Sequence, residues 1–103
     1  MRRILFLGQK VIAERCMDCL KRPSYASALS VVAVGTAPGS PLASQAQHHV
    51  SNTQRNEELL IDLIKTLRAD LLVSVQHPWI LSAKTIEMVH GNAFNLHNAK
   101  IPD

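Results

Sequence analysis

The sequence has few residues of several kinds, and each shortage excludes a class of protein. Its two cysteines are too few for a disulfide framework, and one Trp, one Tyr and two Phe offer little surface for stacking on nucleic-acid bases. No apolar run approaches the roughly 20 residues of a membrane span. Eleven basic residues are interleaved with eight acidic ones, so the net charge of +3 forms no basic stripe. We therefore expect a cytoplasmic protein whose main partner is neither a membrane nor a nucleic acid.

The length of 103 residues and the apolar content of 47% are typical of one small domain with a single core. The start of the chain, Met1 to Arg3 followed by residues 4–7, imitates a signal peptide. However, the apolar run stops at Gly8 after four residues, and no cleavage site of small residues follows it. Residues 4–7 are instead predicted to form a strand buried on both faces of a parallel sheet.

Apolar runs and helical periodicities alternate along the rest of the chain. The predicted strands are 4–7, 29–34, 71–75 and 93–97, and the predicted helices are 12–20, 57–67 and 83–91. Asn56 and Ser82 are suited to cap the second and third helices. Residues 36–56 are predicted to form a long polar loop, and a short strand near Val50 is the alternative for part of it. The alternation predicts an α/β, Rossmann-like parallel sheet of about four strands with helices on both faces.

In such sheets, ligands bind outside the carboxyl ends of the strands, which places function at residues 8–10, 76–79 and 95–98. The first of these turns contains one glycine, so the G-x-G-x-x-G fingerprint of dinucleotide-binding proteins is absent. Lys10 beside a helix N-terminus could bind a phosphate or another anion, although a lysine at a turn is more often only solvated.

Cysteine and histidine pairs give no metal site. Cys16 and Cys19 form a C-x-x-C inside the first predicted helix and, by periodicity, face the core, with no second pair to complete a zinc site. We expect both to be buried structural cysteines. His48 and His49 lie in the polar loop, far in sequence from carboxylate or thiol partners, which makes metal binding the weaker interpretation.

Asn95 and His97 are two residues apart on the last predicted strand and therefore project from the same face. An amide N–H there can stabilise the oxyanion of an acyl-transfer transition state, and an imidazole can donate a hydrogen bond or move a proton. The alternative is a polar strand end that faces water.

The string F-N-L-H-N-A-K-I-P at 94–102 resembles the N-x-H motif and Pro-ended loop of folate-dependent formyltransferases. Residues 2–10 and 69–81 are similar to the opening strand and to the strand and loop before a helix in that family. The resemblance implies that Asn95 and His97 are catalytic. It further implies that one loop borders the pterin pocket and that the first turn contacts the acceptor substrate. The loop residues are Gln76, His77, Pro78, Trp79, Ile80 and Leu81, and the turn residues are Gly8, Gln9 and Lys10.

Within the family, the 94–102 string looks most like the sugar N-formyltransferases. The resemblance then implies transfer of a formyl group from 10-formyltetrahydrofolate to the amine of a nucleotide-linked amino sugar, without a metal. Methionyl-tRNA formyltransferase is the alternative within the family, disfavoured because the chain has no basic face for tRNA. Ser82 stands where the family has a proline, and the family's catalytic aspartate would lie beyond Asp103.

We therefore expect residues 1–103 to be the N-terminal part of a formyltransferase catalytic domain. Ending after a central strand would leave a sheet edge and face uncovered, which favours association with more chain or with another copy. Two other hypotheses stay open. One is a non-catalytic folate-binding, nucleotide-binding or interaction module, and the other is a generic nucleotide-binding domain, which the absent glycine fingerprint weakens.

Overall fold

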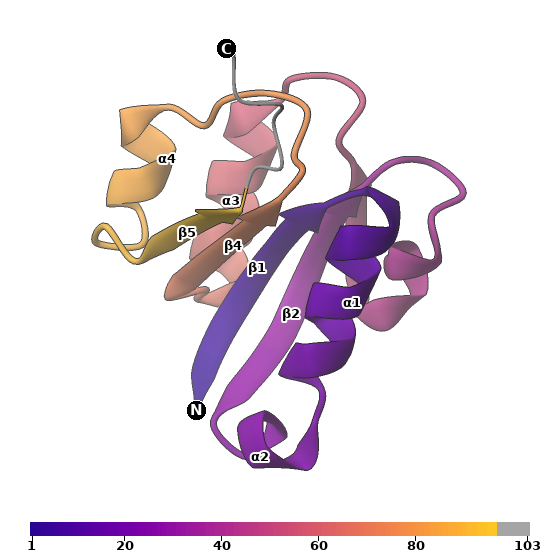
Figure 1. Cartoon of the computed structure of the whole chain (residues 1–103). Helices are drawn as coiled ribbons and strands as arrows, with labels where there is room; N and C mark the ends of the chain where they lie inside the picture. The colour runs from indigo at the N-terminus through magenta and orange to yellow at the C-terminus, as the bar shows by residue number, and fades with distance from the viewer. Residues whose placement is uncertain (97–103) are drawn as a thin grey trace, which may run out of the picture.

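Five parallel strands form one sheet in the order β3-β2-β1-β4-β5 in the computed structural model, which describes residues 1–96 (Figure 1). The strands are β1 (Arg2–Gly8), β2 (Leu29–Thr36), β3 (His48–Ser51), β4 (Leu71–Val75) and β5 (Ala93–Leu96). The helices are α1 (Lys10–Leu20), α2 (Pro23–Ala26), α3 (Glu57–Leu67) and α4 (Ala83–Glu87), with a 3₁₀ helix η1 (Pro41–Gln45). The predicted α/β, Rossmann-like parallel fold is confirmed, with one strand more than expected.

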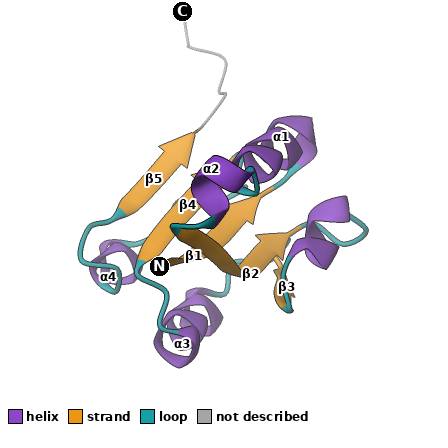
Figure 2. Ribbon diagram, turned by 90° about the horizontal axis from the view of Figure 1, so that it is seen from below, coloured by secondary structure: helices purple, strands orange, loops and turns teal. Residues whose placement is uncertain are grey.

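Helices cover both faces of this sheet, as Figure 2 shows, with α1 on one side and α3 and α4 on the other. Alternate residues of β1 supply the two cores because successive side chains of a strand point to opposite faces. Ile4 and Phe6 pack with Met17 of α1, whereas Leu5 and Leu7 belong to the core formed with α3 and with Val89, which follows α4. Residues 4–7 are fully or almost fully buried, which explains their continuous apolar run.

The predicted helix caps are present. The Asn56 Oδ1 atom accepts a hydrogen bond from the Leu59 backbone N–H at 3.2 Å, and the Ser82 Oγ atom accepts one from the Thr85 backbone N–H at 3.4 Å. Each bond satisfies an N–H group that has no partner inside its own helix. The caps therefore fix where α3 and α4 begin.

The prediction of a long loop over 36–56 was wrong in part. The segment contains η1, which buried Leu42 anchors to the core, and β3, which extends the sheet beyond β2. The suggested strand near Val50 is confirmed as β3, but three of its four residues are exposed at the sheet edge. An exposed edge strand needs few apolar residues. The sequence of β3 therefore contains no apolar run long enough to predict a strand.

The prediction that both cysteines are buried was also wrong. Cys16 is half-buried and packs against the α1 core, whereas Cys19 is exposed. The buried face of α1 is defined by Ala13 and Met17, so Cys19 falls at its margin. Burial, and secondarily the neighbouring Cys19, raises the pKa of the Cys16 thiol. Among residues 1–96, no helix is long and apolar enough to cross a membrane.

Candidate functional site

The three segments predicted to carry function, as far as Leu96, meet at the carboxyl end of the sheet. Gly8 pairs with Val75 across β1 and β4, and the Gln9 N–H donates to the Val75 carbonyl oxygen at 3.2 Å. The Gln76 N–H donates to the Leu96 carbonyl oxygen at 3.0 Å. The carboxyl ends of β1, β4 and β5 are thus adjacent, as the parallel topology predicts.

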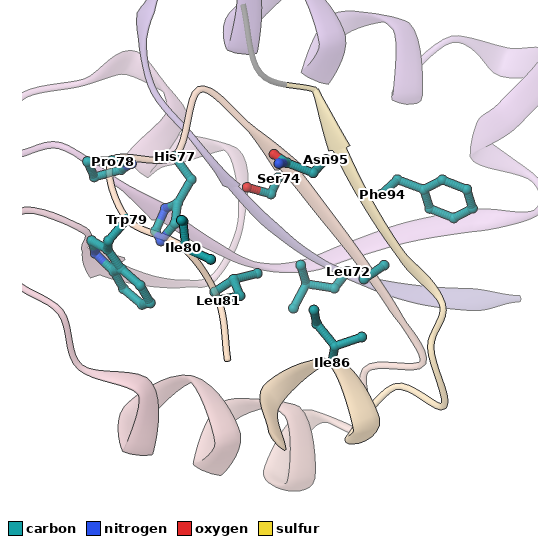
Figure 3. Close-up of a pocket in the computed structure, with 11 residues that line it drawn as sticks. Leu72, Ser74, His77, Pro78, Trp79, Ile80, Leu81, Ile86, Phe94 and Asn95 are labelled. Atoms are coloured by element: carbon teal, nitrogen blue, oxygen red, sulfur yellow. The ribbon is translucent and has the colours of Figure 1, made fainter. Parts of the chain in front are cut away.

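A cavity of about 590 Å³ opens on the α3 and α4 side of this end (Figure 3). Its size lies within the range of small-molecule pockets in proteins. Two strands, the loop after β4 and helix α4 supply its walls, which are largely apolar. The lining residues are Leu72, Ser74, His77, Pro78, Trp79, Ile80, Leu81, Ile86, Ala93, Phe94 and Asn95.

Asn95 reaches this cavity from β5. It pairs in register with Ser74, and Figure 3 shows the two side chains close together at one end of the cavity. The side chains of its neighbours Phe94 and Leu96 point to the opposite face because side chains alternate along a strand, although Phe94 also borders the cavity. The structure therefore brings Asn95 together with five of the six predicted loop residues. Gln76 is not among the lining residues, and His97, the proposed catalytic companion of Asn95, lies outside the described residues.

His77 is a buried residue of this loop. Its side chain is about 7% exposed, and neither ring nitrogen has a hydrogen-bond partner among the described residues. Burial lowers the pKa of His77 to about 4, although the Glu57 carboxylate partly opposes this shift. The ring is therefore neutral at pH 7 and presents one N–H donor and one acceptor nitrogen.

Trp79 is attached to the chain that connects β3 with α3. Its Nε1–H donates to the Asn52 carbonyl oxygen at 3.1 Å, and the Arg55 guanidinium lies 5.7 Å from the centre of a Trp79 ring. Both contacts are polar anchors on a mainly apolar side chain. The indole is thereby fixed at the rim of the cavity.

The Glu57 carboxylate holds the end of the same loop. It accepts hydrogen bonds from the Ser82 backbone N–H at 3.1 and 3.2 Å, from the Ser82 hydroxyl, and from the Thr85 hydroxyl at 2.5 Å. Arg55 forms an ion pair with it at 2.5 Å. Burial by itself would raise the pKa of Glu57, but the hydrogen bonds from Ser82, Thr85 and Arg55 outweigh that effect and lower it to about 2.

Sequence reasoning missed these three anchoring residues, Asn52, Arg55 and Glu57. Glu57 was recognised only as an acidic residue in the first turn of α3, where it also interacts favourably with the helix dipole. Its partners Ser82 and Thr85 are 25 and 28 residues away in the chain. Only the folded structure brings them together.

The predicted substrate turn, Gly8 to Lys10, does not line the cavity. A Cβ atom on Gly8 would lie 2.7 Å from the Val75 carbonyl oxygen and 2.9 Å from the Ala13 Cβ atom, so glycine allows the close approach of β1, β4 and α1. Gln9 is the N-cap of α1 and makes no side-chain cap bond, while Lys10 is exposed. Contact of this turn with a substrate stays a prediction.

A second hollow, of about 320 Å³, lies on the opposite face beside α1. It exists because α1 leaves β5 uncovered, so that Phe94 is 63% and Leu96 48% exposed. Cys16, Cys19 and Leu20 form its other side. Exposed apolar groups on an edge strand fit the expected association with another copy, which stays a prediction.

His48 and His49 lie on β3 and are exposed. Over residues 1–96, no group of three or more His, Cys, Asp or Glu side chains is arranged to hold a metal ion.

Among known proteins, the chain is similar to a solved structure only in its fold. No protein-family model matches the sequence, and no curated protein matches it. The chain is similar to the crystal structure of a phosphoribosylglycinamide formyltransferase from Brucella melitensis, with a TM-score of 0.62 and 18% sequence identity. The match covers 99% of this chain and 60% of that one, so the chain spans less than two thirds of that protein's length. At this level of identity, the similarity establishes the fold.

Proposed function

We propose that the chain binds 10-formyltetrahydrofolate in the cavity between the Gln76–Leu81 loop and β5, and takes part in transferring its formyl group to an amine. The observation that carries the proposal is that Asn95 and five loop residues line one cavity. The formyltransferase resemblance assigns catalysis to Asn95 and pterin binding to this loop. The similarity in fold to a phosphoribosylglycinamide formyltransferase supports formyl transfer as the class of reaction.

The cavity suits the pterin of a reduced folate. A flat heterocycle of this size buries best between apolar side chains, which Leu81, Ile86 and Leu72 provide. Its amide and amino groups then need a few polar partners. The side chains of Ser74 and Asn95, which line the cavity, and backbone groups of the loop can supply them.

The chemistry requires a donor where negative charge develops. The acceptor amine attacks the formyl carbon, which forms a new C–N bond and a tetrahedral intermediate with a negatively charged oxygen. Collapse of this intermediate breaks the bond between the formyl carbon and N10 of the folate. The proton lost by the amine replaces the formyl group on N10. In our proposal, the Asn95 amide N–H donates to the oxyanion, and His97 moves the proton or adds a hydrogen bond.

The proposed acceptor is the amine of a nucleotide-linked amino sugar. This choice rests on the resemblance of residues 94–102 to sugar N-formyltransferases. The first turn at Gly8 to Lys10 would contact the acceptor, where exposed Lys10 could pair with a phosphate. A panel of a nucleotide-linked amino sugar, glycinamide ribonucleotide and methionyl-tRNA would decide among the acceptors, with formylated product measured by mass spectrometry.

Thermal unfolding with increasing 5-formyltetrahydrofolate, a stable analogue of the donor, tests the central proposal. A ligand that binds only the folded state at 100 times its Kd stabilises that state by about 2.7 kcal/mol, so a saturable rise in Tm is expected. The Asn95→Ala, His97→Ala double variant should show a smaller rise. Leu96→Thr is the matched control, because Leu96 points away from the cavity. A folded chain without any rise in Tm would contradict the proposal.

The second candidate is a folate-binding module without catalysis. None of the residues that line the cavity is an Asp or Glu, so within the described part of the chain it lacks a carboxylate that could assist proton transfer. Binding of 5-formyltetrahydrofolate without formylation of any acceptor in the panel would favour this candidate.

A further inference from the structure

The segment between β3 and α3, residues 52–57, touches the loop that follows β4 at three separate points. The Asn52 carbonyl oxygen accepts from the Trp79 Nε1–H at 3.1 Å, and the Arg55 guanidinium lies over the Trp79 ring. Glu57 binds Ser82, the residue directly after the loop. These contacts join parts of the chain that are 24 to 27 residues apart.

The Glu57 contact is the strongest of the three because one carboxylate collects four donors. They are the Ser82 N–H, the Ser82 hydroxyl, the Thr85 hydroxyl and the Arg55 guanidinium. The carboxylate is only 15% exposed, whereas Arg55 is 57% exposed. Hydrogen bonds to an ionised group are shorter and stronger than neutral ones, most of all where water is largely excluded. The carboxylate therefore fixes both the end of the loop and the start of α4.

We propose that Glu57 is a positioning residue of the candidate site. Through Ser82 it holds the end of the Gln76–Leu81 loop, and through its ion pair with Arg55 it holds the guanidinium that lies over Trp79, so that the loop stays in the place where it forms a wall of the cavity. Only the identity of the ligand rests on the proposed function; the positioning of Trp79 does not.

The residue type fits this role. A carboxylate has two oxygens that accept only, which matches four converging donors. Glutamine at this position would keep the length of the side chain but replace one acceptor oxygen with an NH₂ group. That group would face the N–H and hydroxyl donors of Ser82 and Thr85. Glu57→Gln should consequently release the end of the loop while it preserves the size of the side chain.

Trp79 is the only tryptophan of the chain, so intrinsic fluorescence reports the loop directly. We expect Glu57→Gln and Glu57→Ala to shift the Trp79 emission to longer wavelength and to increase its quenching by acrylamide. Glu58→Gln is the matched control, because Glu58 is an exposed acidic residue in the same first turn of α3. It removes the same charge near the helix dipole and should leave the emission unchanged. Far-UV circular dichroism and a cooperative unfolding transition verify that each variant is folded.

The second readout is binding of 5-formyltetrahydrofolate by isothermal titration calorimetry. If the loop occupies its binding position only about a tenth of the time in Glu57→Gln, the apparent Kd rises about tenfold. Glu58→Gln should bind as the unmodified chain does. The two readouts separate the two proposals. If the unmodified chain binds no folate, the proposed function is wrong. The fluorescence of the Glu57 variants then still shows whether Glu57 positions Trp79.

Unchanged emission and quenching in folded Glu57→Gln and Glu57→Ala would overturn the positioning role. So would a shift of Trp79 without any loss of affinity in a chain that binds the folate, because the loop position would then not matter for the site. Should both Glu57 variants fail to fold, Ser82→Ala removes the hydroxyl donor of the same carboxylate without touching the α3 cap or Trp79. A shift of the Trp79 emission in this variant is expected on the same grounds, and unchanged emission would overturn the positioning role.

Discussion

The imidazole of His77 meets the indole of Trp79 edge-on, with ring centroids 4.2 Å apart and ring planes at 65°. This contact puts the only titratable ring of the cavity wall against the only tryptophan. It also buries His77 where a charged imidazolium would lose its hydration. The protonation state of His77, the stability of the fold and the fluorescence of Trp79 are therefore linked.

The first prediction concerns the pH dependence of stability. The pKa of His77 is lowered from 6.5 to about 4 by burial, so between these values the unfolded chain binds a proton that the folded chain does not. The free energy of unfolding consequently falls as the pH drops from 6.5 towards 4, by about 3 kcal/mol in total from this residue. Urea denaturation at pH 7 and pH 4.5 measures the fall, followed by Trp79 fluorescence.

The control for this prediction is a pair of histidine variants. His77→Gln should make the free energy of unfolding nearly independent of pH between 6.5 and 4. His49→Gln, on the exposed edge strand β3, should leave this pH dependence unchanged. Parallel curves for the unmodified chain and His77→Gln would contradict the assignment.

The second prediction concerns the bond between Glu57 and Ser82. The pKa of Glu57 is lowered to about 2, so its contribution to stability is complete above the ordinary value of 4.5 and is lost as the pH falls through 2. A double-mutant cycle with Glu57→Gln and Ser82→Ala should give a coupling free energy of about 1 to 3 kcal/mol, as for hydrogen bonds to charged groups. The coupling should be equal at pH 7 and pH 5. Glu58→Gln combined with Ser82→Ala should give none.

The third prediction separates structure from ligand binding at the first turn. Gly8→Ala forces a Cβ atom against the Val75 carbonyl oxygen and the Ala13 Cβ atom, so we expect a loss of about 1 to 3 kcal/mol, typical of overpacking. Lys10→Gln, on the exposed neighbour, should leave stability within about 0.5 kcal/mol. Chemical denaturation measures both. If Lys10→Gln weakens acceptor binding at unchanged stability, the turn contacts the acceptor through Lys10.

The order of elements could be predicted from the sequence because the buried strands of a parallel sheet are continuous apolar runs. Residues 4–7 and 71–75 are two such runs, and each is flanked by a helix with a cap or a breaker. The strand β3 could not be predicted from an apolar run. It is short and exposed, and it exists because its backbone pairs with β2 from Ala33 to Thr36. Backbone pairing of this kind leaves little trace in the side chains.

The position of the candidate site was predictable, but its construction was not. The rule that ligands bind at the carboxyl ends of parallel strands pointed to the loop after β4 and to Asn95. The attachment of that loop to Asn52, Arg55 and Glu57 depends on contacts between distant segments, which no local pattern encodes. The mistaken burial of Cys19 has a similar cause, since periodicity gives the face of a helix and not how far the sheet beneath it extends.

The last prediction tests Asn95 as the donor to the oxyanion. Asn95→Ala should lower kcat for formyl transfer about 10²- to 10³-fold, because removing one donor of this kind costs mainly the transition state. The KM for the folate should change little, since the loop and the apolar walls of the cavity remain. Leu96→Thr, on the same strand and facing away from the cavity, controls for effects on β5. Single-turnover assays separate the chemical step from product release. A 10²- to 10³-fold rise of KM with kcat unchanged would instead make Asn95 a residue that binds the folate. Equal kcat values for Asn95→Ala and Leu96→Thr would show that Asn95 takes no part in the reaction.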